Sequence, residues 1–122
     1  MARANVLESS ETALCAPGCG GPIVPASLSE AQATEYAEWF KAISDPTRIR
    51  ILNLLACNPE PVCVCDIVEQ FPLGQPTISH HLKILRDTRF VVSERRGSYI
   101  MYTVNRNCIR EFPAAARLIM AV

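Results

Sequence analysis

Apolar residues recur at the spacing of an α-helix in five segments of this chain, with polar residues between them. The first segment begins near Ser27, where Ser27 and Glu30 have the spacing of a capping box. The second begins at Asp45-Pro46, because aspartate is a favoured N-cap and proline a favoured first helical residue. The remaining helices are expected over residues 62–70, 75–88 and 107–120.

The last of these helices contains Pro113. A proline in a helix interior costs about 3 kcal/mol, so the alternative to a start near residue 107 is a start only near Glu111, which places the proline in the first turn. Its apolar face has little to pack on in so small a domain, and pairing with a second subunit would bury it. That face consists of Ile109, Phe112, Ala116, Ile119 and Met120.

Two further segments, residues 90–94 and 99–104, are rich in β-branched and aromatic residues, which predicts two strands. Residues 95–98 join them into a hairpin. Ahead of the hairpin, a glycine-containing turn at residues 71–74 joins two helices, the pattern of a helix-turn-helix. The predicted fold class is therefore mainly α with a β-hairpin: a dimeric winged helix-turn-helix with the order α-α-α-α-β-β-α.

The helix expected over residues 75–88 combines an apolar stripe of Ile78, Leu82 and Leu85 with polar side chains on its other faces. A helix that reads DNA needs such a polar surface. His81 lies nearer the stripe, which fits a structural role as well as a DNA contact. The helix residues expected to contact DNA are Gln75, Thr77, Ser79, His80 and Lys83.

The formal net charge is zero, but the charge is unevenly distributed. Residues 1–40 carry one arginine against five glutamates, a net charge of −4, whereas residues 75–98 have a net charge of +3. A locally basic segment matters more for binding phosphates than the sum over the chain. Arg95 and Arg96 in the hairpin are therefore expected to lie along the DNA backbone.

Residues 1–26 show neither helical nor strand periodicity and are rich in glycine and proline around residues 13–22. We predict a flexible N-terminal arm, residues 1–26, that carries Cys15 and Cys19, and a winged helix-turn-helix domain for DNA binding and dimerisation, residues 27–122. No apolar run resembles a signal peptide or approaches the ~18–20 residues of a membrane helix, which predicts a cytoplasmic protein.

Six cysteines in a cytoplasmic chain of this length indicate metal binding or redox chemistry before disulfides. Cys63 and Cys65 lie one residue apart at the start of a predicted helix. Side chains two apart on an ideal helix point to different faces, so these thiols converge only where the chain is extended or irregular. A structural role as a small buried residue competes for Cys57 and is favoured for Cys108.

Two sulfur atoms do not complete a metal site. The arm offers two more in Cys15 and Cys19, whose spacing allows both to bind one ion. Three thiolates suit As(III) or Sb(III), whereas four suit Cd(II), Pb(II) or Zn(II). The predicted metal ligands are therefore Cys63 and Cys65 with one or both arm cysteines.

Four blocks of sequence, in the same order, resemble the ArsR/SmtB family of bacterial metal-sensing repressors. The blocks read AISDPTRIRIL at residues 42–52, CVCD at residues 63–66, QPTISHHLKILR at residues 75–86 and RRGSY at residues 95–99. The resemblance covers roughly residues 35–105. It implies a dimeric repressor that binds operator DNA without metal and leaves it when metal binds.

The resemblance also implies roles for matching residues. The CVCD block corresponds to the family's thiophilic-ion site, the helix positions Gln75, Thr77, Ser79 and His80 to those that meet the major groove, and Arg95 and Arg96 to the wing. Two positions depart from the family pattern. Gly74 stands where the family often has a serine cap, and Asn105-Arg106-Asn107 replaces the Asp and His of a zinc site found on the last helix of some members, so that site is expected to be absent.

The sequence thus predicts a repressor that binds operator DNA as a homodimer and is released by As(III) or Sb(III), bound through Cys63, Cys65 and one arm cysteine. One alternative is a Cd(II)- or Pb(II)-sensing repressor that uses four thiolates. Another is a thiol redox sensor on the same fold. An enzyme is not expected, because no nucleophile–base arrangement or glycine-rich phosphate loop is recognisable.

Overall fold

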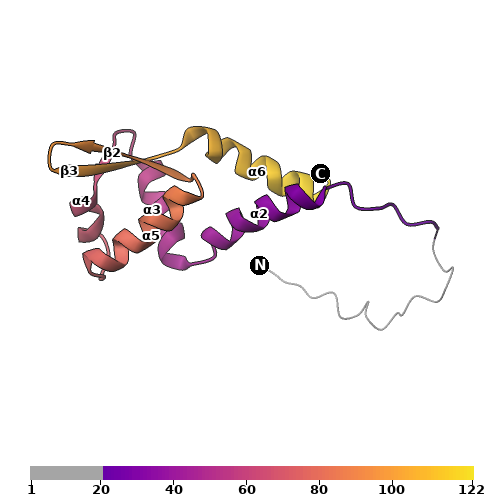
Figure 1. Ribbon diagram of the computed structural model, residues 1–122, viewed down its shortest axis with the longest axis horizontal. Coiled ribbons are helices and arrows are strands. Elements are labelled where there is room, and N and C mark those ends of the chain that lie inside the picture. The colour runs from indigo at the N-terminus through magenta and orange to yellow at the C-terminus, as the bar shows by residue number, and fades with distance from the viewer. Residues whose placement is uncertain (1–20) are drawn as a thin grey trace.

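Five helices and three short strands make up the part of the chain that the computed structural model describes, residues 21–122 (Figure 1). In order they are α2 (Glu30–Ala42), α3 (Pro46–Cys57), β1 (Val62–Cys63), α4 (Val64–Glu69), α5 (Gln75–Asp87), β2 (Val91–Arg96), β3 (Tyr99–Val104) and α6 (Arg106–Met120). Helices α4 and α5 form the helix-turn-helix, and β2 and β3 form the wing. The predicted fold class is confirmed.

The hydrophobic core lies where α3, α4 and α5 pack together with the sheet. The stripe of Ile78, Leu82 and Leu85 on α5 is fully buried, as its spacing predicts. Because three residues of one face are held in the core, the polar faces of α5 must point outward. The other fully buried large side chains are Ile51, Leu55, Ile67, Phe90 and Val91.

The first two helices begin with side-chain caps. On α2 the capping box joins Ser29 and Gln32, not Ser27 and Glu30: Gln32 N donates to Ser29 Oγ at 3.1 Å, and Ser29 N donates to Gln32 Oε1 at 2.9 Å. The sequence holds two overlapping Ser-x-x-Glu/Gln patterns, and the helix uses the second. On α3 the expected cap is confirmed, since Asp45 Oδ2 accepts from the amides of Thr47 and Arg48.

Val62 and Cys63 form a strand rather than the first turn of a helix. β1 pairs antiparallel with β3, with Val62 opposite Tyr102 and Cys63 opposite Met101, so the sheet order is β1-β3-β2. The predicted helix start at residue 62 is wrong, and α4 begins at Val64. Pro61 keeps the chain before β1 extended, and β3 offers a free edge to pair with.

The wing hairpin is tighter than its sequence predicts. Arg95 and Arg96 belong to β2, opposite Ile100 and Tyr99, so they are not part of the connecting loop. Only Gly97 and Ser98 remain in the turn, and Gly97 has φ +65°, a left-handed conformation that favours glycine. The basic residues therefore sit on a paired strand close to the tip.

Helix α6 begins at Arg106, one residue before the predicted start at residue 107, so the alternative start near Glu111 is wrong. Asn105 caps it by accepting from the Asn107 amide at 3.2 Å, and Pro113 lies inside the helix. One residue before the proline, the ring of Phe112 packs against three aromatic rings of other segments. The centroid distances are 5.1 Å to Phe40, 5.5 Å to Phe90 and 6.4 Å to Trp39. This packing holds the first turns of α6 in place and offsets the cost of the internal proline.

Helices α2 and α6 extend to the same side of the molecule, away from the wing (Figure 1). The far end of α6 leaves Leu118, Ile119 and Met120 with 53%, 43% and 70% of their surface exposed. Residues 21–122 of a single copy therefore do not bury this apolar end. None of the helices described is long and apolar enough to span a bilayer.

Candidate metal centre and nucleic-acid interface

Cys63 occupies the junction between the sheet and the helix-turn-helix. It is the last residue of β1 and the N-cap of α4, with the extended angles φ −67° and ψ 143°. Its Sγ accepts a hydrogen bond from the Cys65 amide at 3.3 Å, and only 8% of its surface is exposed. The chain is thus still extended at Cys63, which is the condition under which the two thiols can lie on one side.

Cys65 lies in the first turn of α4 and is exposed. A side-chain hydrogen bond with Cys63 is the main reason that the pKa of the Cys65 thiol is raised, and partial burial and the negative charge of Asp66 add to it. The two thiols are therefore direct neighbours. Because a metal binds thiolate, an ion at this pair would have to displace protons.

The described residues supply two sulfur atoms to this centre and do not complete it. Between residues 21 and 122, no three side chains of His, Cys, Asp or Glu are grouped so as to hold a metal ion. The predicted ligands Cys15 and Cys19 lie outside the described residues. The four described cysteines are free thiols, without a disulfide among them.

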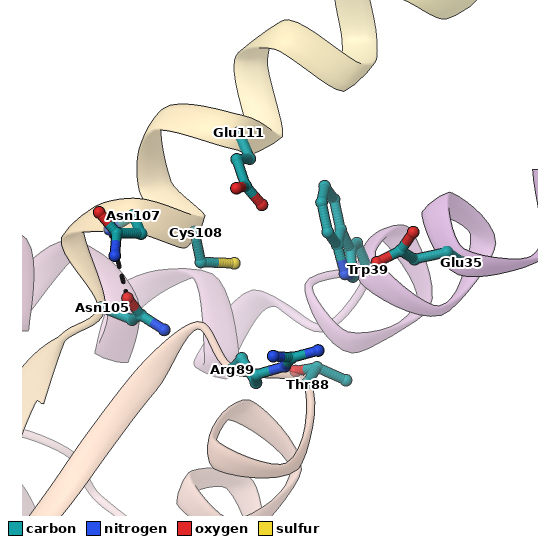
Figure 2. A pocket seen from close by; sticks show the side chains of 8 residues that line it. All are labelled: Glu35, Trp39, Thr88, Arg89, Asn105, Asn107, Cys108 and Glu111. Atoms are coloured by element: carbon teal, nitrogen blue, oxygen red, sulfur yellow. Dashed lines mark hydrogen bonds between the residues drawn. The ribbon is translucent and has the colours of Figure 1, made fainter. Parts of the chain in front are cut away.

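Cys57 and Cys108 have different surroundings. Cys57 is exposed at the end of α3, so a buried structural role is wrong for it. Cys108 is buried on α6, and this burial raises the pKa of its thiol. It borders a cavity of about 270 Å³ between α2, α6 and the turn after α5, shown in Figure 2. Glu35, Trp39, Thr88, Arg89, Asn105, Asn107 and Glu111 complete its lining.

The residues predicted to contact DNA lie on α5 and on β2. Gln75, Thr77, His80 and Lys83 are exposed on α5, whereas Ser79 is half-buried. Arg95 and Arg96, on β2, are exposed as well.

No side chain caps the N-terminus of α5, where Gly74 occupies the N-cap position and Thr77 makes no capping bond. The first amides of a helix carry a partial positive charge and need acceptors. An anionic group placed there would supply them, as phosphates do at helix N-termini. The missing cap thus suits an α5 whose first turn meets a phosphate.

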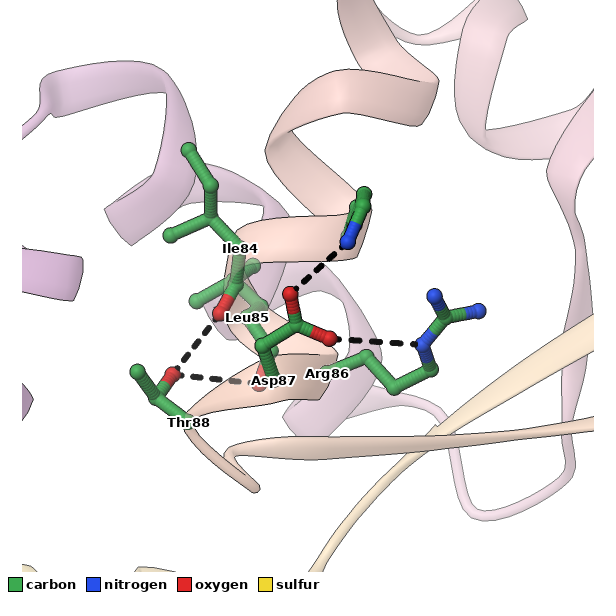
Figure 3. A network of polar contacts seen from close by, with 6 residues as sticks. Ile84, Leu85, Arg86, Asp87 and Thr88 are labelled. Atoms are coloured by element: carbon green, nitrogen blue, oxygen red, sulfur yellow. Dashed lines mark hydrogen bonds and ion pairs between the residues drawn. The ribbon is translucent and has the colours of Figure 1, made fainter.

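Several cations near this surface already have partners in the chain (Figure 3). Asp87 lies 3.0 Å from Lys83 Nζ and 4.0 Å from Arg86 Nε. On the wing, Glu94 pairs with Arg96 at 2.7 Å. All these side chains are about half exposed, and such surface pairs contribute only about 0–1 kcal/mol, so they can exchange for phosphate contacts at little cost.

A family model described as the bacterial regulatory protein, arsR family, matches residues 45–93, which include α3, the helix-turn-helix and the first three residues of β2. The chain is 34% identical over 100 residues to the transcriptional repressor SmtB homolog of Synechocystis. The aligned residues cover 75% of this chain and 74% of that protein. The chain belongs to the ArsR family.

Two further similar proteins bear on this chain. The arsenical resistance operon repressor of Staphylococcus xylosus is 42% identical over 71 residues, which are 58% of this chain and 66% of that repressor. A homodimeric winged helix-turn-helix DNA-binding domain from Mycobacterium bovis, a possible ArsR-family regulator, superposes with a TM-score of 0.60 at 25% identity. It covers 75% of this chain and 87% of that chain.

One contact in this ArsR-family chain was not predicted from its sequence. The Nη1 atom of Arg48 on α3 lies 3.2 Å from Nδ1 of His81 on α5. His81 is half-buried and turned toward Arg48, in line with the structural role weighed for it. The sequence shows a histidine beside the apolar stripe of α5 and an arginine in the first turn of α3. These residues are 33 positions apart, and neither pattern predicts that they are in contact.

The proximity of the two thiols gives a testable expectation. In Cys63→Ala, loss of the neighbouring thiol lowers the pKa of Cys65, so at about pH 8 more of Cys65 is thiolate and its alkylation by iodoacetamide becomes faster, by about threefold. Peptide mapping by mass spectrometry isolates the rate at Cys65 in the reduced protein. Cys57→Ala, which removes a distant exposed thiol, leaves that rate unchanged. An equal or slower rate in Cys63→Ala would show that Cys63 does not act on Cys65.

Proposed function

We propose that this chain is a transcriptional repressor that binds operator DNA as a homodimer and releases it when As(III) or Sb(III) binds to its cysteine thiolates. The observation that carries the proposal is the pair Cys63 and Cys65 at the start of α4, the helix that leads into α5. A soft-ligand site next to a DNA-reading helix is the arrangement that a thiophilic-ion sensor needs.

The effector follows from the number of thiolates. Cys63 and Cys65 form the fixed part of the site, and one arm cysteine, Cys15 or Cys19, completes a set of three for As(III) or Sb(III). The name of the Staphylococcus xylosus relative, an arsenical resistance operon repressor, supports this choice. If both arm cysteines bind, four thiolates suit Cd(II), Pb(II) or Zn(II) instead.

Dimerisation is supported by the exposed apolar end of α6. Leu118, Ile119 and Met120 lie at the far end of α6, which extends away from the wing to the same side as α2 (Figure 1). Contiguous exposed apolar residues of this kind mark interfaces in soluble proteins. The homodimeric Mycobacterium bovis domain supports the same assembly. Two copies would present two α5 helices to successive major grooves of an inverted repeat.

Two contacts could transmit metal binding at Cys63 to the DNA-binding surface. α4 packs against α5, and β1 pairs with β3 of the wing. An ion that ties the arm to Cys63 and Cys65 would act on both. Coupling between two sites is typically about 1–3 kcal/mol, and a nearly complete switch needs about 5.5 kcal/mol. Coupling of typical size would leave repression incompletely released.

The test uses the reduced full-length protein and an inverted-repeat duplex that it selects from a random-sequence library. Saturating As(III) is expected to weaken binding by about tenfold or more, as coupling within the usual range gives. Cys63→Ser abolishes the response, whereas Cys57→Ser retains it. Equal affinity with and without As(III), Cd(II) and Zn(II) would contradict the proposal, and release by peroxide in metal-free buffer with no response to metal would favour a redox sensor.

The arm cysteines decide between the two metal sites in the same assay. With a three-thiolate site, one of the variants Cys15→Ser and Cys19→Ser responds like wild type and the other does not respond. With a four-thiolate site, both variants lose the response equally, which would replace As(III) by Cd(II) or Pb(II) as the proposed effector.

The ion pairs on α5 give a separate prediction for DNA binding. Asp87→Asn frees Lys83 and Arg86, so the affinity for the selected duplex increases by about two- to fivefold at low salt, the equivalent of a surface ion pair. The dependence of log affinity on log salt also steepens, by about 0.9 for each new phosphate contact. Fluorescence anisotropy at several salt concentrations measures both. Glu69→Gln, which removes the same charge from an exposed position on α4, is the control; an equal gain in this variant would show that only net charge matters.

A further inference from the structure

A directional polar link joins helix α2 to helix α5 through Arg48. Arg48 lies in the first turn of α3, where its amide donates to Asp45 Oδ2 at 3.1 Å. Its side chain reaches in two directions. Nε donates to the carbonyl of Ala42, the last residue of α2, and Nη1 contacts Nδ1 of His81 on α5 at 3.2 Å. One side chain thus touches three helices.

The chemistry of the pair decides which side chain accepts the hydrogen bond. An arginine side chain has only donors and stays charged at any pH at which the protein is folded. A hydrogen bond between the two side chains therefore requires Nδ1 of His81 as the acceptor, which is the tautomer with its proton on Nε2. The ring is half-buried and directed at α3. In contrast, the neighbouring His80 is exposed.

The position of the link matters because α5 is otherwise held by apolar packing within the described residues. Ile78, Leu82 and Leu85 anchor the helix in the core, where side-chain packing allows a range of crossing angles and a hydrogen bond narrows that range. At the other end of the link, Ala42 is buried where α2 meets the core. Just ahead of Ala42, α2 contacts α6, whose far end we assign to the dimer contact: the ring centroids of Trp39 and Phe40 lie 6.4 Å and 5.1 Å from that of Phe112.

We infer that Arg48 and His81 are positioning residues that fix the orientation of the DNA-reading helix relative to the dimerisation helices. The inference rests on the proposed function, since it assigns the link a role in matching two α5 helices to one operator. Neither residue touches DNA in this account. Their effect falls on sequence-specific binding, which needs both helices in register, and spares binding to DNA of arbitrary sequence.

A double-mutant cycle tests the link with the inverted-repeat duplex selected by the wild-type protein. Arg48→Met and His81→Leu each weaken binding to that duplex by about tenfold, as expected for loss of a hydrogen bond to a charged group. The double variant binds no more weakly than either single variant, because both remove the same link. Additive losses, or wild-type affinity in His81→Leu, would overturn the inference.

Two controls separate positioning from charge and from folding. Arg50→Met removes the same charge from the same helix without breaking the link. Its affinity for a duplex of unrelated sequence measures how much binding is lost through the change of charge alone. His81→Asn keeps an acceptor within reach of Arg48 and is expected to bind the selected duplex within about threefold of wild type. If His81→Asn binds as weakly as His81→Leu, the acceptor is not what matters and the inference fails.

A readout without DNA distinguishes failure of this inference from failure of the proposed function. Nitrogen-15 NMR of the wild-type protein is expected to show His81 as the single tautomer protonated on Nε2, and Arg48→Met to show a mixture of tautomers. A mixture of His81 tautomers in the wild type would overturn the inference, whatever the DNA-binding measurements give. If no duplex is enriched by the wild type, the proposed function fails, and the NMR result still decides whether the link exists.

Discussion

The pairing of β1 with β3 is the contact on which the rest of the site depends. It is only two residues long, yet it holds Cys63 in an extended conformation and places this thiol, nearly buried, at the first turn of α4. It also connects the thiol pair to the wing, because Cys63 lies opposite Met101 on the strand that pairs with β2. Without this pairing, residues 62–65 would be free to continue α4, and the two thiols would point to different faces.

The packing of α5 in the core constrains which of its faces can meet a ligand. Its stripe of Ile78, Leu82 and Leu85 is committed to the core, so its remaining faces must be polar and are free to meet a ligand. The cations there are balanced by Asp87 and Glu94 on the surface, where ion pairs are weak and exchangeable. Electroneutrality of the whole chain is therefore compatible with a DNA-binding surface: the acidic residues of the first 40 positions offset the basic helix and wing.

Much of the fold could be predicted from the sequence, because it depends on strong local signals. Asp45-Pro46 defined the start of α3, and the spacing of Ile78, Leu82 and Leu85 defined the inward face of α5. The errors arose where distant contacts override local preference. β1 forms because β3 offers an edge, and α6 has its first two turns ahead of Pro113, against the alternative start near Glu111, because Phe112 packs on rings from α2 and from the residue before β2. The thiol pair was readable as a motif, whereas the Arg48–His81 contact joins two helices far apart in the sequence and carries no motif.

X-ray absorption spectroscopy tests whether Cys63 and Cys65 are the fixed part of a thiolate site. The reduced protein is loaded with one equivalent of As(III), and the atoms in the first coordination shell are identified and counted. We expect three sulfur atoms in the wild type, and loss of that shell in Cys63→Ser and in Cys65→Ser but not in Cys57→Ser. An unchanged sulfur shell in both Cys63→Ser and Cys65→Ser, or a shell of oxygen and nitrogen in the wild type, would contradict this assignment.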